Sequence, residues 1–406
     1  MAFRGRVPYG QSLFCRVCTL SGNPGQAVQI PPSGQSLSRV VGENRRGYRN
    51  LTGYPPGRRC ESRRHTEDPS VKLSVLDQSP IRMGGTPRDA VLATIELAQL
   101  ADKLGYTRYW LAEHHNTRTL ASPTPEILIP ALAAATTRIR VGSGGVMLSH
   151  YSPLKVAESF RMLETLHPGR IDLGLGRAPG SDRYTAIALQ PGPVGPPLES
   201  YPNQVNDLLN YMDGELPEDH PYHGITAMPS GPTSPETWLL ASSMGSATVA
   251  AQLGLPLSWA HFITQDGPAI VARYRETFQP SQWLDSPLVN IGISATCAET
   301  TEEARKLGLS RHLMRLRRDQ GQPYDGVPAP ELALEGEFSQ QELAYMAQQQ
   351  ERAIEGDPDF VKREILELAA RYEVDEVIVL TITHRYEDRK RSYELLSEAF
   401  DLESQS

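Results

Sequence analysis

An acid and two histidines stand directly after a short apolar run in the first third of the chain. Glu113, His114 and His115 follow Tyr109–Ala112, which has the composition of a buried strand. Histidines there can move protons in acid–base or flavin chemistry, bind a metal ion, or hydrogen-bond to the backbone of a loop. Metal-dependent hydrolases built on barrels usually carry His-x-His on the first strand, and no strand here does. We take His114 and His115 as candidate catalytic residues and assign no metal ligand.

Glycines at the ends of two further apolar runs indicate a surface for a flat ligand. Gly144 and Gly145 lie in the expected strand Ile139–Met147, and Arg177 follows the strand Ile171–Gly176 at once. Glycine lets the backbone approach a ligand, and the arginine can reach an anionic group. An ion pair at the rim of a barrel is the alternative role for Arg177.

A dinucleotide fingerprint is the alternative for the glycines Gly174, Gly176 and Gly180, which follow a strand as that motif requires. The sequence after them is rich in proline and glycine, and no strand ends in an acid about twenty residues on. This spacing disfavours a nicotinamide-binding unit.

A serine-rich turn indicates a phosphate site. Ser242, Ser243, Met244 and Ser246 lie between the expected strand Thr237–Ala241 and a helix. The first N–H groups of a helix lack internal partners and the helix dipole favours negative charge, so such a turn suits a phosphate. A simple N-cap by serine is the alternative. An arginine at the end of the preceding strand favours the phosphate.

Strands and helices alternate eight times from Val71 to Ala399. The eight expected strands are Val71–Leu76, Tyr109–Ala112, Ile139–Met147, Ile171–Gly176, Thr237–Ala241, Leu257–Phe262, Leu288–Cys297 and Glu376–Ile382. The expected helices between and after them are Pro87–Leu104, Pro125–Thr136, Pro153–Leu166, Ala247–Leu253, Pro268–Phe278, Phe360–Tyr372 and Arg385–Ala399, with a further helix beginning at Thr300–Leu309. Apolar strands without polar alternation are typical of a parallel sheet buried on both faces.

Two longer stretches interrupt this alternation. Asp182–Pro235 follows the fourth strand and contains one expected helix, Tyr201–Met212. After the seventh strand, the stretch from Gly321 to Gly336 is expected to be irregular, and Ser339–Ile354 to be helical. An open doubly wound sheet would usually carry a glycine motif in its first unit, and this chain has none there. The expected fold is therefore an α/β class (β/α)8 TIM barrel with insertions after strands 4 and 7.

Composition divides the chain of 406 residues into a basic leader and an acidic body. Residues 1–70 carry a formal charge of +7 and the remainder −15. We expect 1–70 to be a disordered leader, or an upstream extension of the natural start, and 71–406 to be the barrel. The acidic body disfavours nucleic acid, and no apolar run is long enough for a membrane span. Cys297 is the one cysteine of the body, which favours a reducing, cytoplasmic compartment.

Several segments together resemble the bacterial-luciferase-like, flavin-dependent monooxygenase family. They are LSVLDQSPI, YWLAEHH, RIRVGSGGVML, HYSPLKVAE, GRIDLGLGRAPG and LLASSMGSATVAAQLGLP. The similarity runs from Val71 to about Asp401. It implies a (β/α)8 barrel that binds reduced FMN at the carboxyl ends of its strands.

The resemblance also implies roles for single residues. Arg177 matches the phosphate-contacting arginine, and the serines match the phosphate loop. Gly144-Gly145 matches a dipeptide with a cis peptide bond beneath the isoalloxazine ring, and His114 matches an active-site histidine. Ser79 and His150 are further candidates at the rim.

The activity implied is oxidation of a small organic substrate with reduced FMN and O2. A separate flavin reductase is an expected partner, and a homo-oligomer is expected, with no nucleic acid or membrane partner. A deazaflavin-dependent reductase on the same barrel and a non-catalytic flavin-binding protein remain the alternatives.

Overall fold

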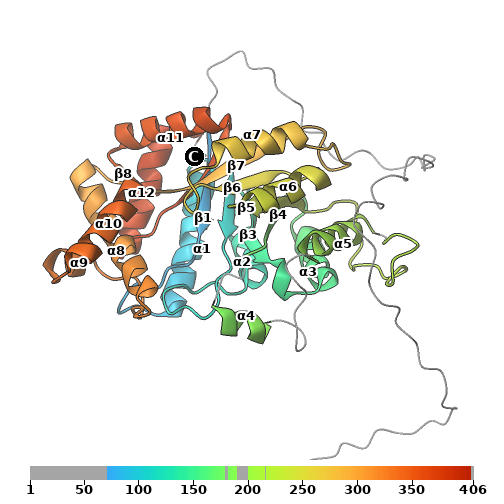
Figure 1. The fold of residues 1–406 in the computed structure, drawn as a ribbon, viewed down its shortest axis with the longest axis horizontal. Helices are drawn as coiled ribbons and strands as arrows, with labels where there is room; N and C mark the ends of the chain where they lie inside the picture. The colour runs from blue at the N-terminus through green and yellow to red at the C-terminus, as the bar shows by residue number, and fades with distance from the viewer. Residues whose placement is uncertain (1–70, 179–181, 190–199, 215, 404–406) are drawn as a thin grey trace, which may run out of the picture. The chain divides into compact units, whose positions relative to one another are not determined.

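Eight parallel strands close into a barrel in the computed structural model, which describes residues 71–178, 182–189, 200–214 and 216–403 (Figure 1). The predictions for the first 70 residues and for Gly180 lie outside these residues. Each barrel strand pairs with two neighbours, and the ring closes where β9 pairs with both β1 and β7. The strands are β1 (Lys72–Asp77), β2 (Arg108–Leu111), β3 (Arg140–Met147), β4 (Ile171–Gly176), β5 (Glu236–Ala241), β6 (Leu257–Ala260), β7 (Val289–Cys297) and β9 (Glu376–Leu380). The predicted (β/α)8 barrel is confirmed.

Helices follow the strands and cover the outside of the barrel (Figure 1). Five of the helices in the repeating units begin with a proline in the first turn, where the missing N–H costs no hydrogen bond. The helices of the repeating units are α1 (Pro87–Lys103), α2 (Pro125–Ala135), α3 (Pro153–Leu166), α6 (Met244–Leu253), α7 (Pro268–Thr277), α11 (Pro358–Tyr372) and α12 (Tyr386–Ala399), with the 3-10 turn η1 (Leu148–His150) after β3.

Insertions follow the fourth and the seventh strand, as predicted. The first contains α4 (Arg183–Leu189) and α5 (Tyr201–Asp213), and the second contains α8 (Thr301–Asp319), α9 (Glu331–Glu335), α10 (Gln340–Glu351) and β8 (Ile354–Gly356). In Figure 1 the second group lies beside α12, on the other side of the barrel from α3 and α5. Among the described residues, no helix combines the length and apolar character needed to cross a membrane.

Four elements differ from the sequence-based predictions. The stretch from Gly321 to Gly336, expected to be irregular, contains the short helix α9. Helix α6 begins three residues earlier than Ala247, so Met244 belongs to its first turn. The helix expected as far as Ile354 ends at Glu351, because Ile354–Gly356 pairs with the end of β7 as a short strand. Helix α4 was not predicted because none of its side chains is buried, so no apolar periodicity marks it.

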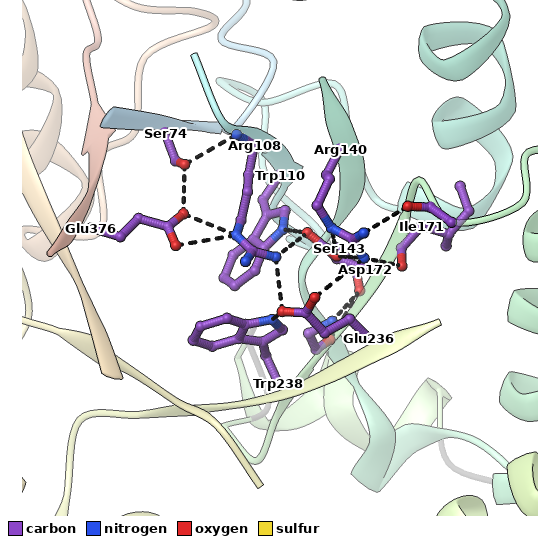
Figure 2. Close-up of polar contacts among 12 residues, drawn as sticks. Ser74, Arg108, Trp110, Arg140, Ser143, Ile171, Asp172, Glu236, Trp238 and Glu376 are labelled. Carbon is purple, nitrogen blue, oxygen red and sulfur yellow. Dashed lines mark hydrogen bonds and ion pairs between the residues drawn. The ribbon is translucent and has the colours of Figure 1, made fainter. Parts of the chain in front are cut away.

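A cluster of charged side chains fills the amino-terminal end of the barrel (Figure 2). Arg108, on β2, forms ion pairs with Asp172 of β4 at 2.9 Å, Glu236 of β5 at 3.1 Å and Glu376 of β9 at 2.9 Å. Arg140 Nε, on β3, donates to Asp172 at 2.7 Å. We call these five residues the barrel floor. They connect five of the eight strands from the inside.

Tryptophans complete the barrel floor. Trp110 donates to Asp172 at 2.9 Å and Trp238 donates to Glu236 at 2.7 Å, and the guanidinium of Arg108 lies 4.8 Å from the centre of the Trp238 ring (Figure 2). Burial alone would lower the pKa of Arg108, but the carboxylates of Glu376, Asp172 and Glu236 raise it well above its usual value. Arg108 is therefore a permanent cation whose charge its partners compensate.

Replacing Arg108 by methionine should destabilise the protein by about 3–5 kcal/mol, because it leaves buried carboxylates without their partner. Urea unfolding measures this loss. Arg273→Ala is the matched control: its ion pair with Glu276 lies on the surface, so the change should cost under about 1 kcal/mol. A loss for Arg108→Met as small as that of the control would show that the barrel floor does not stabilise the fold.

Candidate active site at the carboxyl end of the barrel

A pocket inside the barrel is lined by residues of the strands and of the segment after β6. Its lining is mostly apolar and includes Leu76, Trp110, Gly144, Leu240, Phe262 and Ile378. The Gly144-Gly145 peptide bond is cis, as the family resemblance implied. A Cβ atom at Gly144 would lie 2.9 Å from Leu76 and from Trp110, and one at Gly145 would lie 2.6 Å from the carbonyl oxygen of Gly174. Only glycine fits at both positions, and Gly144 presents bare backbone to the pocket.

Arg177 and the serine turn meet at the carboxyl ends of β4 and β5. The guanidinium of Arg177 donates to Ser243 Oγ at 3.3 Å, and a Cβ atom at Gly245 would lie 3.4 Å from the same guanidinium. Ser243 is the N-cap residue of α6, yet its side chain makes no capping hydrogen bond. Among the described residues, the first N–H groups of α6 therefore have no capping side chain, and an arginine stands beside them.

The other predicted cofactor-binding residues lie near these strand ends in different environments. Ser242 is half-buried, Met244 is exposed and Ser246 is buried. Ser79 is fully buried after β1, and its hydroxyl accepts a hydrogen bond from Thr94 at 2.9 Å. His150 is buried in η1, directly after β3. Their roles in cofactor binding stay predictions.

His114 is a half-buried histidine whose ring nitrogen Nδ1 is shielded from solvent. Among the described residues, no group hydrogen-bonds to this nitrogen. Burial lowers the pKa of His114 to about 4, with smaller contributions from the positive charge of Arg318 and from His115. The imidazole is therefore neutral at pH 7 and keeps one nitrogen as a proton acceptor.

His115 belongs to a hydrogen-bonded group around Glu113. Its Nε2 lies 2.7 Å from Glu113 Oε1, which also accepts a hydrogen bond from Tyr151 at 2.8 Å. Glu113 Oε2 accepts from the backbone N–H of Met147 at 3.0 Å, and the rings of His115 and His150 meet edge to face at 6.3 Å. A carboxylate only accepts hydrogen bonds, so Glu113 orients His115 with the proton on Nε2.

The contacts form a continuous series from β2 to β5. Glu113 and His115 follow β2 and contact residues at the end of β3, Ser149 Oγ lies 3.5 Å from the carbonyl oxygen of Arg177, and Arg177 contacts Ser243. The structure thus brings the candidate catalytic and binding residues of four neighbouring strands to one end of the barrel.

Two residues that the sequence analysis did not select also belong here. Glu113 is buried and organises the histidine group. Tyr201, on α5, is 1% exposed and its hydroxyl has no hydrogen-bond partner among the described residues. Burial raises the pKa of Tyr201, and the charge of Arg177 opposes that rise, so the phenol lies within electrostatic reach of Arg177. No local motif marks Tyr201, because it comes from the insertion.

The sequence profile of the luciferase-like monooxygenases matches residues 71–374. The chain belongs to the luciferase-like monooxygenase family. It is 44% identical over 331 residues to the Bacillus subtilis (strain 168) protein YwcH, in an alignment that covers 81% of this chain and 99% of that protein. It is 34% identical over 330 residues to the N-acetyl-S-alkylcysteine monooxygenase of the same organism, covering 81% and 98%.

Solved structures of other proteins have the same fold. The apo structure of MsnO8 has a TM-score of 0.76 and 40% identity and covers 82% of this chain and 100% of that one. The oxygenating component of 3,6-diketocamphane monooxygenase from Pseudomonas putida, solved with FMN, has a TM-score of 0.58 and 18% identity, covering 81% and 97%. An F420-dependent secondary alcohol dehydrogenase has a TM-score of 0.59 and 13% identity, covering 82% and 99%. The last two likenesses concern the fold alone.

His114 should stay neutral down to acidic pH in this luciferase-like protein. A proton on its ring has to be accommodated in a buried site, so the titration midpoint should lie near 4, well below the 6.5 of an exposed histidine. NMR of the imidazole groups between pH 3.5 and 8 measures it, and His114→Gln identifies the signal. A midpoint at 6 or above would contradict the buried environment described here.

Proposed function

We propose that the protein is a flavin-dependent monooxygenase that oxidises a small organic substrate with reduced FMN and O2. The observation that supports this most directly is the convergence of Arg177, Ser243 and the first turn of α6 in a barrel whose interior pocket is lined by Gly144. A phosphate needs donors without other acceptors, and a planar ring needs a wall without side chains. Both conditions are met at one end of one barrel.

Different residues would bind the phosphate and the ring of FMN. Arg177 and Ser243 would hold the phosphate together with the N–H groups at the start of α6, and the buried hydroxyl of Tyr201 would donate to it. Each charge-assisted hydrogen bond of this kind contributes about 1.5–3 kcal/mol. Gly144-Gly145 would support the ring from below, over Leu76 and Trp110.

Reduced FMN, when bound, supplies the two electrons that place one oxygen atom in the substrate and release the other as water. The neutral His114 would accept a hydrogen bond beside the reacting groups, because its shielded Nδ1 has no protein partner among the described residues. Glu113 and Tyr151 would hold His115 in one orientation. The insertions after β4 and β7 would limit the access of water to the mouth of the barrel.

Arg177→Ala should weaken FMN binding at least tenfold, about 1.4 kcal/mol, since it removes a cation from the phosphate. Tyr201→Phe should weaken it by a similar factor while leaving the stability of the flavin-free protein unchanged, because the lost hydroxyl has no partner among the described residues. Quenching of flavin fluorescence measures both dissociation constants. Arg88→Ala, an exposed change on α1, is the control and should have no effect. An unchanged constant for Arg177→Ala would contradict the phosphate site.

The reaction itself is tested with oxygen isotopes. The FMN-loaded protein is reduced without air and mixed with 18O2 and a panel of thioethers and ketones, beginning with N-acetyl-S-methylcysteine because of the name of the relative described above. One 18O atom in a product is the expected result. Retention of a deazaflavin in preference to FMN, with reduction of a substrate, would support a deazaflavin-dependent reductase instead. Oxidation of the flavin with no product across the panel would indicate a flavin-binding protein without this activity.

A further inference from the structure

One buried arginine makes no hydrogen bond and no ion pair within the part of the chain that the structure describes. Arg311 lies in the middle of α8 and is 6% exposed. Within the described part of the chain, no residue accepts a hydrogen bond from its guanidinium or forms an ion pair with it. The other three buried arginines there, Arg108, Arg161 and Arg389, each donate hydrogen bonds to carboxylates or carbonyl oxygens. Burying an uncompensated guanidinium costs several kcal/mol, so its position calls for an anion.

The nearby carboxylate lies beside a histidine and forms no ion pair with Arg311 among the described residues. Glu355, on β8, lies with Oε1 2.8 Å from His312 Nε2. The Glu355 carboxylate packs against α8 at Gly308. A Cβ atom at this glycine would lie only 2.0 Å from Glu355 Oε1, so glycine leaves room for the carboxylate. Arg315, one turn after Arg311, donates to Gln349 at 2.9 Å. This partner is a neutral amide, so it adds no negative charge near Arg311.

The surroundings of Arg311 are suited to accept negative charge. Burial and the guanidinium groups of Arg315 and Arg318 together lower the pKa of Arg311 to about 9, against the opposing charge of Glu355. These arginines are four and seven positions along the helix, on the same side as Arg311. The hydroxyl of Ser310 is fully buried and also lacks a partner among the described residues.

The same helix borders the mouth of the barrel. Met314, one turn after Arg311, packs against the cluster that contains Leu76, Trp110 and Val327. The positive charge of Arg318 contributes to the lowered pKa of His114. The segment after α8 returns across the strand ends, where Val327 donates its backbone N–H to the carbonyl oxygen of Ile81. A group bound at Arg311 therefore sits beside the candidate active site.

We propose that Arg311 binds the carboxylate of an organic-acid substrate at the edge of the barrel mouth, with Arg315 adding positive charge. This proposal rests on the proposed monooxygenase function, because the bound acid is a substrate only if the protein oxidises it. An arginine that is left unpaired in the free protein discriminates strongly between an acid and a neutral molecule of the same shape, because only the acid compensates its charge.

Binding is tested first without flavin, so that the result does not depend on the reaction. The probes are 3-(methylthio)propanoate and its amide, which have the same size and differ in charge, and the readout is the thermal midpoint of the full-length protein at constant ionic strength. The acid should raise the midpoint of the wild type and of Arg305→Met, an exposed change on the same helix, and the amide should not. Arg311→Met should lose the response to the acid, and Arg311→Lys should keep part of it. Because Arg311→Met removes an uncompensated buried charge, it should fold with unchanged or higher stability.

Turnover of the FMN-loaded protein then separates a substrate site from a simple anion site. If the acid is a substrate group, Arg311→Met should raise its KM at least tenfold and leave the KM of the amide unchanged. An equal thermal response in wild type and Arg311→Met would overturn the proposal, as would loss of the response with KM unchanged, which would mean an adventitious ion only. Absence of any FMN-dependent turnover would refute the proposed function, whereas the thermal arm would still decide whether Arg311 binds an acid.

Discussion

The ion pairs of Arg108 constrain the whole barrel. One guanidinium contacts carboxylates from three other strands, and Arg140 from a fourth strand contacts two of those carboxylates. The barrel floor fills the amino-terminal end of the interior with long polar side chains and two tryptophans. Small residues lie further toward the carboxyl end, where Gly144, Ala260 and Gly292 are among those that line the pocket. A barrel packed with apolar side chains throughout would have no room for a planar ligand.

The open end of the barrel follows from this division. Because the strands are parallel, the segments after β2, β3, β4 and β5 must meet there, and the contacts from Glu113 to Ser243 run through all four. Each segment contributes a different chemistry: a neutral imidazole, a wall of bare backbone, a guanidinium and the start of a helix. None of these features is a site by itself. Their common position is what supports the proposed flavin chemistry.

The sequence predicted the barrel because burial on both faces produces apolar strands at regular intervals, and these are visible without coordinates. It predicted the meeting of Arg177 with the serine turn for the same reason, since adjacent parallel strands end side by side. Tyr201 and Arg311 could not be predicted in this way. Both come from insertions, whose path depends on tertiary packing, and what distinguishes them is the absence of a partner among the described residues. A missing hydrogen bond leaves no trace in sequence spacing. The short strand β8 was missed because three residues are too few to show a period.

A crystal structure of the protein with FMN tests the central claim most directly. The account predicts the phosphate within hydrogen-bond distance of Arg177 and Ser243, and the isoalloxazine ring against Gly144-Gly145 inside the barrel. A flavin bound elsewhere, or bound here with its phosphate pointing away from Arg177, would contradict it.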